Sequence, residues 1–360
     1  MIKHVNSKDL FLNFDPQGPQ ERFRAAGIEG ASLAASDLLP DPVPWPKNTA
    51  PIPSPLPVTP GEDEDMTKFH GYDAVIMTWT VAEAATLSTL MSPGYTLPQW
   101  YQYRHNVEDY IPLVTGKTAP FNDAESKMYY HSLGLYFPCT IGNAKVLLIK
   151  SGLHLDDDGP KIPVSKLIAE IVSTVSPKVF ITTGTGGGIG SDVSLGDVVI
   201  AGMTRFDCTT QFKKEPWSSA SFPTSPLPSG VLAAITPALT KVNAARVKGG
   251  RSVPKIFSAA QDAIVTTDFF GFDDSTDYYK LQGLGRVCDM GDAMVGQVMQ
   301  QFPGVKWYAI RNASDPQIPN PGNNVRQAEN EAGQIYAKYG ALTTAASVIA
   351  SWAVIVTSFP

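Results

Sequence analysis

Short apolar runs alternate with helix-forming segments along most of this chain, and this alternation limits the possible folds more than any other feature. The first run, DAVIMTWT, follows Tyr72 and has the length and β-branched content of a strand, while VAEAATLSTLM after it has helical spacing. The alternation recurs at AKVLLIKSG, SKLIAEIVSTVS, PKVFITTGTGGG and VKWYAIRNASD. Nearly continuous apolar strands between helices indicate a sheet covered on both faces. We therefore predict a single α/β domain over residues 71–360, with a central mixed, mostly parallel twisted sheet flanked by helices on both faces.

Residues 1–70 precede this pattern and are predicted to form an N-terminal extension. Nine prolines fall within residues 40–60, and because each proline ring removes an amide donor, helices and interior strands cannot propagate there. We interpret this segment as an extended strap. The acidic run at residues 62–65 is interpreted as solvated surface rather than a metal site. Residues 1–39 contain amphipathic fragments that fit an arm packed either on the main domain or on a neighbouring subunit.

Charge and composition exclude several classes of protein. The 28 Lys and Arg residues against 34 Asp and Glu residues give a net charge of −6, so we predict no nucleic-acid partner. Three cysteines without metal-clamp spacing exclude a disulfide scaffold. The first residues lack the apolar core of a secretory signal, which predicts a cytoplasmic protein. The apolar segment ALTTAASVIASWAVIV could be a membrane tail, but its short length and its Thr and Ser content favour a buried closing helix, and no membrane partner is expected.

A glycine-rich segment directly after an apolar strand is the first candidate for a ligand site. It runs from Thr182 to Gly190, where glycines let the backbone approach a ligand closely and threonine hydroxyls add donors. The alternative is a tight turn without a ligand. The segment neither opens a helix, as a dinucleotide fingerprint does, nor ends like a P-loop. NAD and nucleoside triphosphates are therefore disfavoured, and a small polar ligand with a sugar or an oxyanion is favoured.

Three acidic segments are candidates for catalysis. Asp315 ends the strand that contains WYAI and follows Ser314, which can orient it, so it lies where a general acid would be useful. The alternative there is an Asp-Pro turn that merely ends the strand. Glu83 follows the first strand, although a single Glu opening a helix is most often a surface charge or a dipole partner. Asp289 and Asp292 interrupt an apolar segment, where carboxylates are costly unless they are paired or bind something.

Taken in order, these segments resemble the nucleoside phosphorylase and nucleosidase superfamily, in its purine nucleoside phosphorylase, uridine phosphorylase and methylthioadenosine nucleosidase branch. TTGTGGGIGSDVSLGDVVIA is similar to that family's signature of TGSAGG followed by GDVV. RNASD at residues 311–315 resembles RAISD, and VCDMGDAMVG stands where the family has VEMEAAAVA. The resemblance covers about residues 72–355. It implies the α/β fold of the superfamily and no metal or organic cofactor, with phosphate as the co-substrate of its phosphorylases.

The resemblance also implies roles for individual residues. Asp315 matches the acid that protonates or hydrogen-bonds purine N7 while the sugar gains oxocarbenium character, and Ser314 matches the residue that positions it. Glu83 lies where hydrolytic members keep the glutamate that activates water. Phe270 lies in the aromatic segment TDFFGF at residues 267–272, which could simply be part of the core, and it matches the ring that packs on the base. Met290 matches the methionine beneath the ribose. The other predicted substrate-binding residues are Thr183, Gly184, Thr185 and Gly186 in the glycine segment, and Asp289, Gly291 and Asp292 in the acidic segment.

The sequence departs from the family pattern at Gly291, where the family has the glutamate that grips the ribose hydroxyls. A carboxylate on a sugar diol makes two charge-assisted hydrogen bonds, each worth about 1.5–3 kcal/mol, and glycine supplies neither. Three explanations stay open at this point. Asp289 or Asp292 reaches the diol, the sugar is deoxygenated or recognised differently, or the fold serves another substrate.

We therefore predict an enzyme that cleaves the N-glycosidic bond of a nucleoside, and most simply of a purine nucleoside, by hydrolysis or phosphorolysis. Hydrolysis is favoured because Glu83 offers water a base and no arginine cluster is evident, although Arg104 and Arg205 could hold phosphate. One alternative is a repurposed enzyme that uses the same acid and base on a planar non-nucleoside metabolite. Another is a non-catalytic nucleoside-binding protein. Members of the superfamily usually form dimers, trimers or hexamers, which implies a homo-oligomer.

Overall fold

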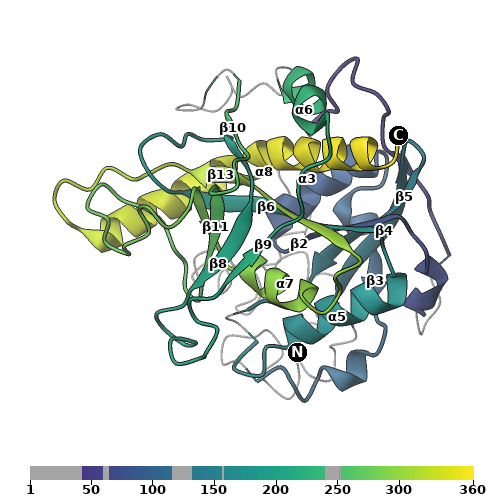
Figure 1. The fold of residues 1–360 in the computed structure, drawn as a ribbon, viewed down its shortest axis with the longest axis horizontal. Helices are drawn as coiled ribbons and strands as arrows, with labels where there is room; N and C mark the ends of the chain where they lie inside the picture. The colour runs from purple at the N-terminus through teal and green to yellow at the C-terminus, as the bar shows by residue number, and fades with distance from the viewer. Residues whose placement is uncertain (1–42, 60–64, 116–131, 156–157, 240–250, 252) are drawn as a thin grey trace, which may run out of the picture.

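The computed structural model shows a thirteen-stranded sheet with helices on both sides (Figure 1). The predicted arm over residues 1–39 and the acidic residues 62–64 lie outside the part of the chain that the structure describes. The described residues are 43–59, 65–115, 132–155, 158–239, 251 and 253–360.

Strand β6 (Val179–Gly188) lies at the centre of the sheet, and all of its residues are buried. It continues through the glycine segment, which is therefore strand rather than turn. Strand β13 (Lys306–Asp315) runs parallel to β6 along nearly its whole length, and β2 (Ala74–Thr78) runs parallel to the first half of β6. Strand β12 (Val287–Asp289) pairs antiparallel with the end of β6. Three strands thus meet in one row, in which Gly187 of β6 is paired with Asp315 on one side and with Cys288 on the other.

The rest of the sheet extends this centre on both sides. Strands β5 and β4 follow β2, and strands β11 and β8 follow β12. Parallel pairing joins β5 to β2 and links β12, β11 and β8, so the predicted mixed α/β sheet is confirmed. The bounds of these strands are Gly134–Ile141 for β4, Ala144–Ser151 for β5, Met203–Asp207 for β8 and Ala263–Thr267 for β11. The short strands are β1 (Ser54–Pro55), β3 (Tyr101–Tyr103), β7 (Val198–Ile200), β9 (Ser221–Pro223) and β10 (Ile256–Phe257).

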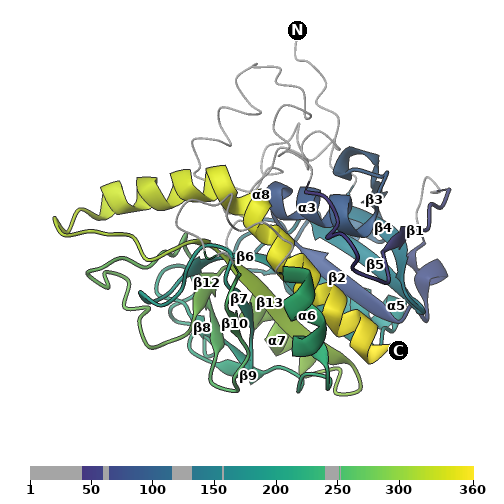
Figure 2. The ribbon, with the colours of Figure 1, turned by 90° about the horizontal axis from the view of Figure 1, so that it is seen from above.

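Helices cover the two faces of the sheet in separate groups (Figures 1 and 2). On one face α8 contacts α3 and α6 and packs on β13 and β6, and on the other face α5 contacts α7. The bounds are Val81–Met91 for α3, Pro163–Val175 for α5, Val231–Leu239 for α6, Asp292–Met299 for α7 and Val325–Ser358 for α8. Short 3-10 turns lie at Met66–Phe69, Leu97–Gln99 and Val107–Asp109.

Helix α8 contains the apolar C-terminal segment. The helix is long and apolar enough to cross a membrane by length and composition, but 78% of its most apolar window is buried inside the protein. Its first turns extend beyond the sheet, and its later turns lie across the sheet (Figure 2). Burial against β13 and β6 accounts for the apolar composition and supports the predicted closing helix.

The described part of the proline-rich strap packs on the main domain. Ser54 and Pro55 pair antiparallel with β4, which makes the strap an edge strand of the sheet, where proline is tolerated. The Trp45 and Trp352 rings pack edge to face with centroids 5.7 Å apart, and the Trp352 indole donates a hydrogen bond of 2.8 Å to the Pro51 carbonyl. The predicted domain boundary at residue 70 stays a prediction.

Candidate active site

Asp315 is the last residue of β13, and the sheet holds it beside Gly187. The Ser314 hydroxyl donates a hydrogen bond of 2.9 Å to Oδ1 of Asp315 and lies 3.2 Å from the Gly186 carbonyl oxygen. A β-carbon on Gly187 would lie 3.2 Å from Oδ2 of Asp315, tighter than ordinary contact, so the glycine gives this oxygen its room. Among the described residues, none donates a hydrogen bond to Oδ2. Asp315 thus has one fixed oxygen and one oxygen free for a ligand.

The surroundings of Asp315 favour its protonated form. Only 3% of the residue is exposed to solvent. Burial raises the pKa of the carboxyl to about 7, and the hydrogen bond from Ser314 opposes this shift. A carboxyl with a pKa near the working pH is suited to general acid catalysis, because it is protonated often enough and still gives up its proton readily. Asp315 can therefore donate a proton at neutral pH.

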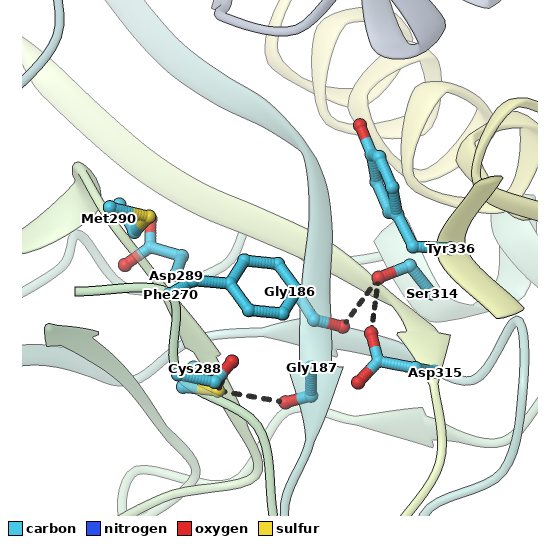
Figure 3. Close-up of a pocket in the computed structure, with 10 residues that line it drawn as sticks. Gly186, Gly187, Phe270, Cys288, Asp289, Met290, Ser314, Asp315 and Tyr336 are labelled. Carbon is cyan, nitrogen blue, oxygen red and sulfur yellow. Dashed lines mark hydrogen bonds between the residues drawn. The ribbon is translucent and has the colours of Figure 1, made fainter. Parts of the chain in front are cut away.

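A pocket with about 320 Å³ of empty space, part of it open to solvent, lies in front of Asp315 (Figure 3). In this view the Phe270 ring projects toward the Ser314 and Asp315 side chains, and Tyr336 of α8 starts near Ser314 with its hydroxyl pointing away from Asp315. Rings and a thioether on the walls suit a planar heterocycle, while Asp315 supplies the polar contact. The lining residues are Gly186, Gly187, Phe270, Gly271, Cys288, Asp289, Met290, Ser314, Asp315 and Tyr336.

A buried ion-pair cluster lies behind this pocket and is centred on Arg311 of β13. Its Nε and Nη2 donate to the two oxygens of Asp292, each at 2.8 Å, in a bidentate pair. Nη2 also lies 3.1 Å from Oδ2 of Asp289, and Nη1 donates to Oε1 of Glu83 at 3.4 Å and to the Thr185 carbonyl at 3.2 Å. The side chains of the arginine and the three acids are fully buried. We call these four residues the Arg311 cluster.

Glu83 is fixed from both sides of its carboxylate. Oε1 accepts hydrogen bonds from the backbone and the hydroxyl of Thr185 at 2.6 and 2.8 Å, and Oε2 accepts from the hydroxyl of Thr78 and the backbone of Trp79 and Thr80. Thr80 and Glu83 also form the capping box of α3. Burial opposes the charged form, but Arg311 and these donors outweigh it and lower the pKa of Glu83. Glu83 is a buried, ionised residue and a weak base.

Asp289 also belongs to the Arg311 cluster, but its pKa is raised rather than lowered. Its Oδ1 accepts from the Thr266 hydroxyl at 2.6 Å, and its Oδ2 accepts from the backbone of Asp292 at 2.9 Å. Burial and the nearby charge of Asp292 raise its pKa to about 7, although Arg311 and these hydrogen bonds oppose the shift. One guanidinium does not neutralise three buried carboxylates, so the cluster takes up a proton near neutral pH.

The structure brings half of the predicted site residues together in the pocket. Gly186, Phe270, Asp289, Met290, Ser314 and Asp315 line it. Glu83, Thr185 and Asp292 belong instead to the contacts of the Arg311 cluster, and Gly184 packs against Glu83. Thr183 on β6 and Gly291, the N-cap residue of α7, are likewise outside the pocket lining among the described residues. A water-activating role for Glu83 stays a prediction, and its geometry does not favour that role.

Sequence reasoning missed four lining residues. Gly187, Gly271 and Cys288 lie in segments that were singled out. The pairing of β6 with β12 places Gly187 beside Cys288, and the Cys288 thiol donates to the Gly271 carbonyl. Tyr336 comes from α8, and no local pattern marks it. Cys288 is no candidate nucleophile, because burial and the nearby acid Asp315 raise the pKa of its thiol well above the ordinary value. Within the described residues, no group of three or more His, Cys, Asp or Glu side chains is arranged to hold a metal ion.

Comparison with known proteins places this arrangement in a family. The model of the phosphorylase superfamily matches residues 105–345. The 5′-methylthioadenosine/S-adenosylhomocysteine nucleosidases of Shewanella halifaxensis and Shewanella piezotolerans are 29% and 27% identical over 174 and 179 residues. These alignments cover 47% and 49% of this chain, and 68% and 70% of the relatives.

Solved structures share the fold at lower identity. The Helicobacter pylori 5′-methylthioadenosine/S-adenosylhomocysteine nucleosidase in complex with butyl-thio-DADMe-Immucillin-A has a TM-score of 0.50 at 12% identity, covering 80% of this chain and 99% of that one. Futalosine hydrolase of the same organism has a TM-score of 0.50 at 13% identity, covering 79% and 97%. At such identities the likeness shows the fold alone.

The mixed α/β fold is shared with the solved nucleosidase and futalosine hydrolase structures. Because the family model matches more than half of the sequence, the chain belongs to the phosphorylase superfamily. The predicted family and the prediction of an enzyme that acts on N-glycosidic bonds are thereby confirmed.

Gly184 allows the close approach of Glu83 to β6, so its substitution tests the Arg311 cluster. Gly184 has a φ of +154°, and a β-carbon there would lie 2.2 Å from Oε1 of Glu83 and 2.9 Å from Nη1 of Arg311. We expect Gly184→Ala to lower the free energy of unfolding by about 3–5 kcal/mol, as for a broken buried ion pair. Gly304→Ala, where nothing lies within 4 Å, is the control and changes it by less than about 0.5 kcal/mol. Urea unfolding measures both, and equal losses would contradict the packing argument.

The raised pKa of Asp315 predicts a pH-dependent cost to stability. The folded carboxyl titrates near pH 7 and the unfolded one near 3.8, so between these values only the unfolded chain releases the proton. Rising pH therefore destabilises the fold, by about 4 kcal/mol in total for this group. Asp315→Asn removes the cost, so we expect its stability relative to wild type to rise from pH 4 to 7 and then stay level. Denaturant unfolding across this range tests the prediction, and a constant difference would refute it.

Proposed function

We propose that this enzyme hydrolyses the N-glycosidic bond of a purine nucleoside, with Asp315 as the general acid at the base. The observation that carries the proposal is the free oxygen of Asp315. The carboxyl is buried and has a raised pKa, and among the described residues nothing donates to its Oδ2. An acid with these properties at the wall of a pocket lined by rings can deliver a proton to a planar heterocycle.

The proposed reaction balances without a cofactor. Asp315 gives its proton to N7 of the purine while the bond between C1′ and N9 breaks, and the bonding electrons leave with the base. Water then bonds to C1′ of the oxocarbenium-like sugar and releases one proton to solvent, from which Asp315 is reprotonated. Protonation of the base matters because a neutral purine is a far better leaving group than its anion. General acid catalysis of this kind typically contributes about 10²–10⁴ in rate.

Ser314 and Glu83 are positioning residues in this proposal. The Ser314 hydroxyl holds Oδ1 of Asp315, which leaves Oδ2 for the base. Glu83 holds Thr185 of β6 and Arg311 of β13, the two strands on which the pocket residues Gly186 and Asp315 are mounted. Glu83 is fully buried and does not line the pocket. Its contribution is therefore to align these strands rather than to take a proton from water.

The relatives suggest where to look for the substrate. The named nucleosidases act on 5′-methylthioadenosine and S-adenosylhomocysteine, and another structural neighbour is a futalosine hydrolase. We therefore propose adenosine and its 5′-thio derivatives as the first substrates to test. No metal or organic cofactor enters the proposal, and phosphate is the alternative to water as nucleophile. The predicted homo-oligomer and cytoplasmic location belong to the same proposal.

Asp315→Asn tests the general acid directly. We expect kcat for base release from adenosine or 5′-methylthioadenosine to fall by about 10²–10⁴, because asparagine cannot donate the proton, while KM changes little. Ser314→Ala, which leaves the acid in place but frees Oδ1, should cost less. The measurement is the rate of free base formation by chromatography. Unchanged kcat in Asp315→Asn would rule out this residue as the acid.

The same assay identifies the nucleophile. Hydrolysis predicts equal rates of base release with and without inorganic phosphate, and free sugar as the second product. An absolute requirement for phosphate, with a sugar 1-phosphate as product, would instead assign the chain to the phosphorylases of its superfamily. The absence of base release from every nucleoside tested, under both conditions, would overturn the proposed function itself.

A further inference from the structure

The packing around Gly291 determines whether a longer side chain at this position could reach a bound sugar. A β-carbon on Gly291 would lie 3.4–3.6 Å from three carbons of the Trp79 indole. Trp79 is 2% exposed, its backbone donates to Glu83, and the Arg311 guanidinium lies 5.1 Å from its ring centroid. The indole is thus held between the Arg311 cluster and Gly291. It fills the volume into which a longer side chain at 291 would extend.

The two neighbouring acids are also committed to other partners. Both oxygens of Asp292 bind Arg311 at 2.8 Å, and the residue is fully buried. Asp289 borders the pocket, but its oxygens accept from Thr266, from the backbone of Asp292 and from Arg311. Turning Asp292 toward a sugar would break its bidentate pair with the buried guanidinium, and turning Asp289 would break its hydrogen bonds from the Thr266 hydroxyl and the Asp292 backbone, so both changes are unfavourable. Neither acid is therefore available to replace a side chain at 291.

The remaining lining presents little that could grip two sugar hydroxyls. Asp315 is the acid with a free oxygen, and the proposed function uses that oxygen on the base. The other described lining groups are Phe270, Met290 and Tyr336 side chains, the buried Cys288 thiol and glycine backbone. The Cys288 thiol itself donates to the carbonyl oxygens of Gly187 and Gly271 at 3.5 and 3.2 Å. Apart from Asp289 and Asp315, the described lining therefore contains no carboxylate that could bind a sugar diol.

We infer that this enzyme binds its nucleoside without a carboxylate on the 2′,3′-diol, so that a 2′-deoxynucleoside is cleaved at least as well as the matching ribonucleoside. The inference rests on the proposed function and specifies the sugar that the site accepts. The chemistry adds to it, because the electron-withdrawing 2′-hydroxyl destabilises the cationic sugar of the transition state. If the enzyme makes no favourable contact with this hydroxyl, no binding energy compensates for the destabilised transition state, and the ribonucleoside reacts no faster than the deoxynucleoside.

The first test compares kcat/KM for adenosine and 2′-deoxyadenosine, and for their 5′-methylthio derivatives. We expect the deoxy substrate to equal or exceed the ribo substrate in each pair. A preference of tenfold or more for the ribo substrate would overturn the inference, since this is the least that one charge-assisted hydrogen bond to the diol provides. Such a preference would leave the proposed function intact.

Substitutions of Asp289 and Asp292 test whether either acid binds the sugar diol. If Asp292 or Asp289 bound the diol, then Asp292→Asn or Asp289→Asn would weaken only the ribo substrate and change the ratio of the two kcat/KM values. We expect the ratio to stay within about threefold of wild type, whatever happens to the absolute rates. A tenfold shift of the ratio toward the deoxy substrate in either variant would refute the inference.

If these variants do not fold, the binding of uncleavable analogues to the wild-type protein tests for a contact with the diol. The probes are a purine-like C-nucleoside, whose base is joined to the sugar through carbon, and its 2′-deoxy form, with dissociation constants from calorimetry. Equal affinities support binding without a carboxylate on the diol even if no nucleoside is cleaved, in which case the proposed function fails and this binding mode stands. Tenfold tighter binding of the ribo form overturns the inference. Binding of neither analogue would overturn both.

Discussion

The buried guanidinium of Arg311 is the interaction on which the rest of the site depends. It binds Asp292 of α7, Asp289 of β12, Glu83 of α3 and a carbonyl of β6, and so it joins five elements through one side chain. A buried charge that loses its partners costs several kcal/mol, which makes the register between these elements hard to change. Asp315 follows four residues later on the same strand, and its place beside Gly187 is a consequence of that register.

Environment divides the carboxylates of this region into two kinds. Glu83 has a cation and five hydrogen-bond donors, and these keep it charged despite complete burial. Asp315 is equally buried, but its one described hydrogen bond comes from Ser314, and burial therefore keeps its proton on. The same type of side chain is thus held as an anion in one place and kept protonated near neutral pH in the other. The difference lies in the cation and the several hydrogen-bond donors around Glu83, against the single donor at Asp315.

Much of the fold and the core of the site could be predicted from the sequence. The apolar runs gave the strands, and Asp315 and Ser314 were recognisable from their place at a strand end and from the RNASD motif. The glycine segment was harder, because strand β6 continues through it only by virtue of pairing with β13 and β12. The capping-box pattern Thr80-x-x-Glu83 could have indicated a structural role for Glu83. Tyr336 and the packing of Trp79 on Gly291 depend on tertiary contacts that no local pattern encodes.

The central claim is that Asp315 donates a proton to the purine ring, and a nucleoside whose N7 is replaced by carbon tests it most directly. The measurement is kcat for adenosine and for 7-deazaadenosine, in wild type and in Asp315→Asn. If Asp315 acts on N7, the deaza substrate should lose about 10²-fold or more in wild type and little further in the variant, because each change removes the same interaction. Equal losses from the deaza substitution in both proteins would contradict the account.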